Sequence, residues 1–484
     1  MVFSSETFLF LFLPLFLVIY YLTPTRGKSL VILFASYLFY GWWRFDFLLL
    51  LFLTTLWAFG IGLLIRNNIG TARAQLWCTI GVIGCLGVLG VFKYLNFFID
   101  SLAELVGTDA AGLGVHWRLI LPIGVSFYVF HSISYLVDVT RRDADATLSF
   151  FDFAAFIALF PQLVAGPILR FKDLADQFRH RTHSLQMFAD GTALFIIGLG
   201  KKVILADSVA PIADVAFATP DPSLALAWLG SIAYMMQLYF DFSGYSDMAM
   251  GLGLMMGFHF RANFNMPYIS RSITEFWRRW HISLSVWLRD YLYIPLGGNR
   301  ISERRTYINL TLVMVLGGLW HGANGTFLAW GIWHGAWLAL ERRTGWANRT
   351  SLVGLFQTLI IVLVGWVAFR AADMGQAMDV YAGMIGLHGV ALPIDVALQI
   401  SSESLMLLVL AMVVAGTEPQ LNAIARQMYF TPSDPQIGGP EIAGAGTLTA
   451  ATSLLPTLLI SAIGVISIMK LAEASFSPFL YFQF

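Results

Sequence analysis

The amino-acid sequence predicts an all-α integral membrane protein, and three observations support this prediction. Only 12% of the 484 residues are charged, about half the share of a soluble globular protein. Hydrophobic residues make up 58% of the chain, and the mean hydropathy is +0.72. Stretches such as FLLLLFLTTLWAFGIGLLI (47–65) are nearly free of charge and are long enough to cross the hydrocarbon core as helices.

Fourteen apolar segments follow one another along the chain, and we expect roughly 11–14 of them to be membrane segments. They lie at 5–24, 29–43, 46–65, 76–97, 118–137, 149–168, 188–206, 224–240, 245–258, 306–320, 325–340, 351–369, 397–415 and 452–470. The first is expected to be a retained span, because a basic region and a small-residue cleavage site are missing around it. Several others are short or polar, which favours re-entrant or interfacial helices.

Lysine and arginine residues mark the loops expected on the cytoplasmic side. They follow the first, third and fifth segments as Arg26 and Lys28, Arg66 and Arg73, and Arg141 and Arg142. This alternation places the N-terminus in the periplasm. It would place the basic run RFKDLADQFRHR (170–181) outside if 149–168 crossed the membrane.

Segment 149–168 is therefore expected to be re-entrant. It contains Pro161, Gly166 and Pro167, which break a straight helix. Non-helical backbone at membrane depth is tolerated where protein or a watery cavity surrounds it. A re-entrant segment would return the basic run to the cytoplasm. An ordinary kinked span that violates the charge rule is the alternative.

We expect one membrane domain over residues 1–484. Its compositional break at 417–450 contains several prolines and glycines, which indicates an exposed loop. Cys78 and Cys85 both lie in an apolar stretch and are interpreted as packing residues. The formal net charge of zero gives no bulk attraction to nucleic acid, so membrane lipid is the expected surroundings.

Polar groups are concentrated in residues 259–335, within a chain that otherwise avoids them. On a helical projection of 274–298, one stripe contains Trp277, Trp280, Leu284, Trp287, Leu288 and Tyr291. A second stripe contains Arg278, His281, Ser285 and Arg289. Such a helix fits best along the interface or beside a cavity. Its arginines would then contact either lipid phosphates or the phosphates of an acyl donor.

His321 ends an apolar segment and lies between Gly318 and Gly322, with Asn324 just beyond. Glycines let backbone and substrate approach closely. The residue is interpreted either as a reactive imidazole at membrane depth or as a histidine that holds two helices together. His334 recurs in a second Trp-His-Gly, about 20 Å away along a continuous helix, too far to share a metal with His321.

Other chemistries lack their sequence patterns. HExxH, Cys/His zinc spacings, GxSxG, GxxxxGK[ST] and a GxGxxG after a strand are not found. We therefore expect no metal centre. The remaining candidate is a histidine that takes a proton from a hydroxyl attacking a thioester.

Many separate motifs, in one order over nearly the whole chain, resemble the membrane-bound O-acyltransferase family. They include LFPQLVAGPI (159–168), QLYFDFSGYSDMAMGLG (237–253), NFNMPYISRSITEFWRRWHISLSVWLRDYLYIPLGGNR (263–300), GGLWHGANGTFLAWGIWHG (317–335) and the terminal FLYFQF. The resemblance is strongest to the bacterial members that modify polysaccharides. It implies that His321 is the active-site histidine, that His281 matches its upstream partner, and that His334 has a structural role.

The resemblance also implies a multi-pass enzyme of the bacterial inner membrane that takes acetyl groups from cytosolic acetyl-CoA through a central tunnel. The expected product is an O-acetylated exported polysaccharide, alginate or alternatively cellulose or another exopolysaccharide. A periplasmic or membrane-anchored O-acetyltransferase and a polysaccharide synthesis and secretion complex are the implied partners. A transporter or scaffold without thioester chemistry is the rival interpretation.

Several polar residues are candidates for contacts with the substrates of this reaction. The cations would hold the phosphates of the acyl donor, and the two other residues lie in the quoted motifs. The candidates are Lys201, Lys202, Arg278, Arg279, Arg289, Asn324 and Asp241.

Overall fold

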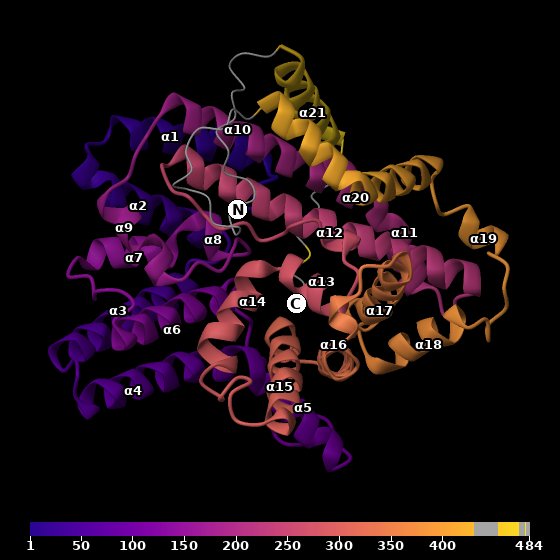
Figure 1. Ribbon diagram of the computed structural model, residues 1–484, viewed down its shortest axis with the longest axis horizontal. Coiled ribbons are helices and arrows are strands. Elements are labelled where there is room, and N and C mark those ends of the chain that lie inside the picture. Colours follow the sequence, from indigo (N-terminus) through magenta and orange to yellow (C-terminus); the bar gives the residue numbers. More distant parts are fainter. Residues whose placement is uncertain (430–453, 474–479, 481–484) are drawn as a thin grey trace. The chain divides into compact units, whose positions relative to one another are not determined.

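The computed structural model describes residues 1–429, 454–473 and 480 (Figure 1). These residues form helices and loops without a strand, which confirms the all-α class. They group into two compact units. Unit 1 contains Met1–His183 and Met256–Phe258, and unit 2 contains Ser184–Met255 and the described residues from His259 onward. That the chain is one domain stays a prediction.

Unit 1 consists of nine helices in the described residues. They are α1 (Leu13–Leu22), which continues the π-helical turn η1 (Thr7–Phe12), α2 (Lys28–Gly41), α3 (Phe47–Asn67), α4 (Ala72–Leu89), α5 (Leu95–Leu105), α6 (Val125–Arg141), α7 (Phe150–Ala158), α8 (Phe160–Leu163) and α9 (Phe171–Arg179). A π-helical turn, η3 (Gly90–Tyr94), joins α4 to α5. α6 begins later than the apolar pattern indicates, because Gly124 takes a left-handed conformation just before it.

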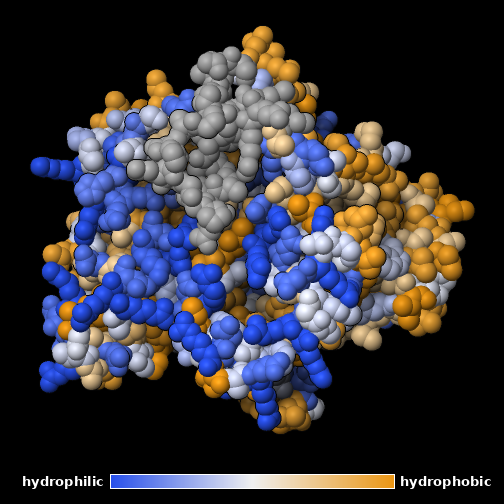
Figure 2. All heavy atoms as spheres, viewed as in Figure 1, coloured by the Kyte–Doolittle hydropathy of each residue, from blue (hydrophilic) through white to orange (hydrophobic). Residues whose placement is uncertain are grey.

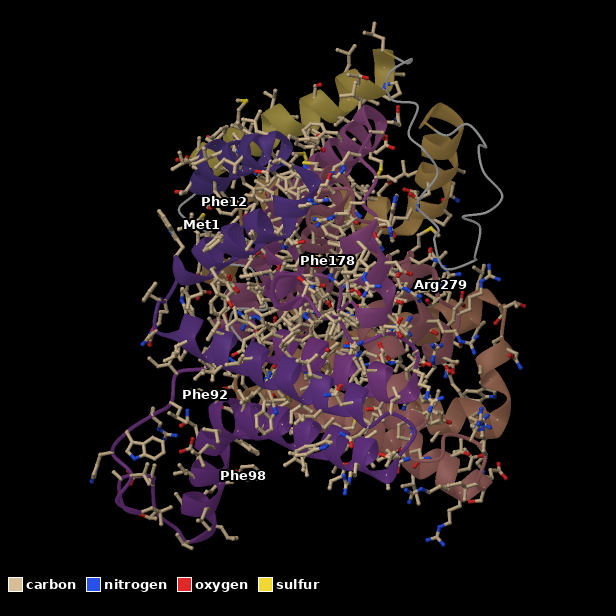
Figure 3. The ribbon with its side chains drawn as sticks, turned by 90° about the vertical axis from the view of Figure 1, so that its left-hand side faces the viewer. Met1, Phe12, Phe92, Phe98, Phe178 and Arg279 are labelled. Carbon is tan, nitrogen blue, oxygen red and sulfur yellow. The ribbon has the colours of Figure 1, made fainter. Side chains whose placement is uncertain are left out.

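Segment 149–168 is interrupted, as its prolines and glycine predict. α7 has nine residues, and at about 1.5 Å per residue it is too short to cross a membrane. The break is buried inside protein. Phe160 packs at 5.2 Å from the ring of Phe16 and 5.6 Å from that of Phe39, within a cluster that includes Phe12 (labelled in Figure 3). Its backbone N–H donates to Ser36 Oγ at 3.1 Å, so a backbone group freed by the break is paired.

Unit 2 contains the remaining helices. They are α10 (Leu185–Gly200), α11 (Asp207–Ala218), α12 (Leu224–Met255), α13 (Ile273–Arg279), α14 (Ile282–Leu288), α15 (Glu303–His321), α16 (Gly325–Thr344), α17 (Leu352–Arg370), α18 (Met374–Met384), α19 (Ile394–Ala397), α20 (Ser402–Tyr429) and α21 (Leu454–Glu473). The π-helical turn η4 (Lys201–Ala206) joins α10 to α11, and η6 (Arg289–Tyr293) follows α14. The predicted segments 224–240 and 245–258 are one helix, α12, of 32 residues.

α12 runs beside α10 in Figure 1, and pairs of glycines bring the two backbones together. A Cβ placed on Gly198 would lie 2.5 Å from the carbonyl oxygen of Gly244, and one on Gly244 would lie 2.6 Å from that of Gly198. Gly191 and Gly251 repeat this arrangement at 2.5 Å in both directions. The pairs are seven residues apart on each antiparallel helix, so small residues set the approach of these helices.

Five helical stretches of the described residues are long and apolar enough to cross a membrane: Phe47–Asn67, Ala72–Leu105, Leu352–Arg370, Ser402–Ala423 and Leu454–Glu473. This supports a membrane protein. The number is lower than the expected 11–14 segments, because many of the remaining helices are short or polar. Figure 2 shows hydrophobic side chains over α18 and α19, where Leu387, Ile394 and Leu398 are more than 70% exposed.

The exposed loop predicted at 417–450 is wrong over its first part. α20 continues through Tyr429, although it contains Pro419. The remainder, 430–450, lies outside the described residues.

Candidate active site

The predicted amphipathic helix at 274–298 is wrong, because the chain breaks at Trp280 and His281. α13 ends at Arg279, Trp280 is extended, and His281 adopts a left-handed conformation with φ 44° and ψ 54°. A non-glycine residue with this backbone is strained, and such strain is concentrated at functional sites. The break turns His281 away from the exposed Arg278 and Arg289 and buries it to 1% exposure.

Asn263 fixes this break. Its backbone oxygen accepts the N–H of Ile282 at 2.8 Å, and its side-chain Oδ1 accepts the N–H of Ser283 at 3.2 Å. These are the first two backbone donors of α14, which a helix leaves unpaired. Oδ1 also lies 2.8 Å from Ser283 Oγ and 3.0 Å from Nδ1 of His281. One buried asparagine therefore holds both the backbone and the ring of His281.

His321 is the last residue of α15 and is 6% exposed. Its ring lies among aromatic side chains from three helices, with centroid distances of 4.9 Å to Trp320, 5.4 Å to Trp330 and 5.1 Å to Phe369. Gly322 continues the chain, and a Cβ there would overlap the ring of Phe327. The glycine thus lets the chain turn tightly beyond His321.

The structure brings His281 and His321 close together. Their ring centroids are 6.3 Å apart. This separation is too long for a direct bond between ring nitrogens, which needs about 3 Å between them. Burial lowers the pKa of His281, which lies outside the five candidate spans, to about 3, so its ring is neutral at ordinary pH.

His334 is packed apart from this pair. It is fully buried on α16, with centroid distances of 5.1 Å to Trp277 and 5.2 Å to Trp330. A Cβ on Gly365 would lie 2.6 Å from its Nε2, so the ring fits against the backbone of α17. This environment is consistent with the packing role implied for His334.

The two lysines among the substrate-contact candidates lie in intramolecular ion pairs. Lys202 Nζ is 2.8 Å from Asp241 and 2.6 Å from Asp207, while Lys201 Nζ is 2.8 Å from Asp247. Asp241 also accepts the backbone N–H of Leu480 at 2.9 Å. These contacts join η4, α12 and the C-terminal part of the chain. Their carboxylates neutralise the lysine charges that a phosphate would need.

The remaining candidates differ in their surroundings. Arg279, labelled in Figure 3, pairs with Glu275 at 2.9 Å and donates to the backbone oxygen of Asn265 at 3.1 Å. Arg289 pairs with Asp290 at 2.7 Å. Asn324 caps α16 and donates to the backbone oxygen of Ala372 at 2.7 Å. Arg278 is exposed at the end of α13.

Sequence reasoning missed several residues that build the site, namely Phe242, Ser246, Asn263, Ser283, Trp330 and Phe369. Asn263 was visible only as a polar residue in a loop motif, eighteen positions before His281. The contact between Asn263 and His281 could not be predicted at this separation in sequence, because it depends on how the loop folds back on α14. In the described part of the chain, no group of three or more His, Cys, Asp or Glu residues could hold a metal ion.

Residues 32–371 match the sequence model of MBOAT, the membrane-bound O-acyltransferase family. The chain belongs to the membrane-bound O-acyltransferase family. The matched region contains both histidines and every helix around them, from α12 to α17. The protein is therefore an acyltransferase that uses an acyl donor, which confirms the enzyme class expected from the sequence.

Individual relatives of this membrane-bound O-acyltransferase modify different polymers. The chain is 52% identical to the probable alginate O-acetylase AlgI of Azotobacter vinelandii over all of both chains. It is 36% identical to the peptidoglycan O-acetyltransferase of Helicobacter pylori over 81% of each chain. It is 28% identical to the teichoic acid D-alanyltransferase of Streptococcus thermophilus over 57% of this chain and 74% of the other.

Proposed function

We propose that this acyltransferase moves acetyl groups from cytosolic acetyl-CoA across the bacterial inner membrane for the O-acetylation of alginate. The observation that supports this most is the full-length similarity, at 52% identity, to a probable alginate O-acetylase. The buried pair of His281 and His321, with rings 6.3 Å apart, supplies a site suited to acyl transfer. Alginate is favoured over peptidoglycan because the peptidoglycan-modifying relative is less similar, at 36% identity.

In the proposed reaction, His321 acts as the general base. An acceptor hydroxyl attacks the thioester carbonyl, a C–O bond forms, and the C–S bond of acetyl-CoA breaks. His321 takes the proton of the hydroxyl and returns it to the leaving CoA thiolate, so protons balance. Because His321 lies at the C-terminal end of α15, the partial negative charge of that helix end stabilises a positive charge on its ring.

The donor is proposed to enter a tunnel from the cytosolic side, with Arg278 at its phosphates. Arg278 is exposed, whereas Arg279, Arg289, Lys201 and Lys202 have carboxylate partners within the chain. Among the seven predicted contacts, Arg278 is thus the cation best able to accept a new anion. Arg278→Ala should raise KM for acetyl-CoA.

The direct test is thioester cleavage by the purified protein in detergent. With acetyl-CoA, a mannuronate oligosaccharide and the separate O-acetyltransferase proposed below, the wild-type protein should release free CoA in step with acetyl ester formation. A transporter or scaffold would release none. Absence of acceptor-dependent CoA release from a folded preparation would contradict the proposal.

We further propose that a separate periplasmic or membrane-anchored O-acetyltransferase receives the acetyl group and places it on the polymer. The support is the family resemblance of the sequence to such two-component systems. The test uses liposomes with acetyl-CoA inside and polymer outside, with and without the second enzyme. Full polymer acetylation by this chain alone would remove the hand-off step and make His321 the terminal catalyst.

A further inference from the structure

The hydrogen bonds of Asn263 define which ring nitrogen of His281 carries a proton. The backbone N–H of Ser283 can only donate, and it lies 3.2 Å from the Asn263 atom that also faces His281. That atom must therefore be the carbonyl oxygen of the amide and not its nitrogen. The other end of the amide is consistent, because Nδ2 donates to Ser246 Oγ on α12 at 3.0 Å.

An amide oxygen only accepts hydrogen bonds, so Nδ1 of His281 must donate to it. A neutral imidazole carries one N–H, and Nε2 of the same ring is then a hydrogen-bond acceptor. Asn263 is fully buried, and its oxygen accepts from three groups at once. The opposite tautomer would place a lone pair against a lone pair in a buried site, which is costly.

We propose that Asn263 is a positioning residue that locks His281 as the Nδ1–H tautomer, so that His281 enters acetyl transfer as a hydrogen-bond acceptor through Nε2. This rests on the proposed function of the site and deepens it. His281 and His321 then have different tasks, because Asn263 fixes the proton on His281 and His321 is the general base. As the C–O bond forms, His321 takes the hydroxyl proton and then returns it to the leaving thiolate, while neutral His281 presents Nε2 beside it as a hydrogen-bond acceptor.

Aromatic side chains and His321 lie around the ring of His281. Phe242 of α12 lies edge-on at a centroid distance of 4.7 Å, and Trp320 of α15 lies at 6.2 Å. The titratable ring in contact with it from a packed element is that of His321. Asn263 supplies the hydrogen bond, so replacing this one side chain should change the behaviour of His281 with pH.

The kinetic test compares Asn263→Asp with Asn263→Ala in the full-length protein. The aspartate retains an oxygen for all three donors and adds a negative charge, which stabilises the imidazolium and raises the pKa of His281. Asn263→Asp should therefore keep kcat within about threefold at alkaline pH, while the acid limb of its pH profile moves to higher pH. Asn263→Ala should lower kcat at least about tenfold, because the Nε2 acceptor of His281 beside the proton transfer to His321 is no longer fixed.

Ser246→Ala is the matched control, because it removes the partner of the amide nitrogen and leaves the bond to His281. It should alter thermal stability without moving the acid limb. Equal losses of kcat in both Asn263 variants, with an unmoved acid limb in Asn263→Asp, would overturn the proposal and leave Asn263 a purely structural residue.

A second measurement does not depend on whether the Asn263 variants fold. In the ¹⁵N spectrum of histidine-labelled wild-type protein, the signals that vanish in His281→Gln should be those of a neutral ring protonated at Nδ1. A ring protonated at Nε2 would overturn the proposal. This spectrum can be read even if the protein cleaves no acetyl-CoA, so failure of the proposed function and failure of the tautomer assignment are distinguishable.

Discussion

At the scale of single residues, each histidine of the site has a different kind of support. His281 is held by the hydrogen bond that its Nδ1–H donates to one buried amide oxygen, at a backbone conformation that only a few residue types adopt readily. His321 is held by aromatic packing at the end of a helix. His334 is packed among aromatic side chains. Its ring contacts Trp330, which also contacts His321.

The variants His321→Ala and His334→Ala should separate catalysis from packing. His321→Ala should reduce acetyl transfer by about 10²–10⁴-fold with a melting temperature near that of the wild type. His334→Ala should instead lower stability by about 2 kcal/mol or more, because it leaves a cavity among tryptophans. Transfer rates and thermal melts of both purified variants provide the comparison. A large stability loss in His321→Ala alone would reverse the assignment.

The sequence predicted both histidines but not the amide that orients one of them. His321 stands out because glycines flank it at the end of an apolar segment. His281 stood out only through the resemblance to the family, since a helical projection placed it beside Arg278 and Arg289. The left-handed backbone at His281 depends on bonds from Asn263, a tertiary contact that local periodicity does not contain.

At the scale of elements, glycines determine how closely the helices that hold the site approach each other. A Cβ on Gly331 of α16 would lie 2.6 Å from the carbonyl oxygen of Met314 on α15, and one on Gly318 would overlap the backbone of Phe327. α15 and α16 therefore form a tight antiparallel pair around the turn after His321. The glycine pairs of α10 and α12 give unit 2 a second close contact.

Gly198→Ala should destabilise the protein by about 1–3 kcal/mol, because the added Cβ meets the backbone of α12 and not a movable side chain. Gly416→Ala in α20 is the matched control. Its Cβ would meet nothing within 4 Å, and alanine favours a helix by up to about 1 kcal/mol over glycine. The measurement is the melting temperature of both variants and the wild type in the same detergent. Equal shifts of the melting temperature in the two variants would show that the close α10–α12 contact does not determine stability.

Most helices could be predicted from the sequence, since long apolar runs specify them directly. Residues 46–65 became α3 and 351–369 became α17 with boundaries shifted by one or two positions. The division of α12 was wrong, because Asp241, Ser243 and Gly244 resemble a polar interruption but are buried inside a continuous helix. The start of the loop at 417 was wrong because Pro419 is accommodated within α20.

In the whole molecule, the direction of the chain across the membrane decides which parts of the protein face the cytosolic donor. Basic loops predict that residues 25–28 and 66–73 lie in the cytoplasm, and the interrupted segment 149–168 is expected to return the chain to that side. α7 is too short to cross, and its break is packed against α1 and α2. The path of the basic run beyond it stays a prediction.

A cysteine at position 180 should be protected from outside in intact spheroplasts. His180→Cys is exposed, and it would be the sole thiol in a background that lacks Cys78 and Cys85. A membrane-impermeant thiol reagent should label it only after the membrane is opened. Phe45→Cys, in the exposed loop between α2 and α3, is the control that should label at once. Rapid labelling at position 180 in closed spheroplasts would contradict the re-entrant path.

The most direct test of the central claim, that His281 and His321 act as one site, measures acceptor-dependent release of CoA from acetyl-CoA. The purified proteins are the wild type, His281→Ala, His321→Ala and the double variant. Residues that act as a unit show strongly non-additive losses. The rate of the double variant should therefore lie within about twofold of the rate of the slower single variant. A thermal melt of each protein checks that it is folded. Losses that multiply in the double variant, or a His321→Ala protein that retains more than about a tenth of the wild-type rate, would contradict the account.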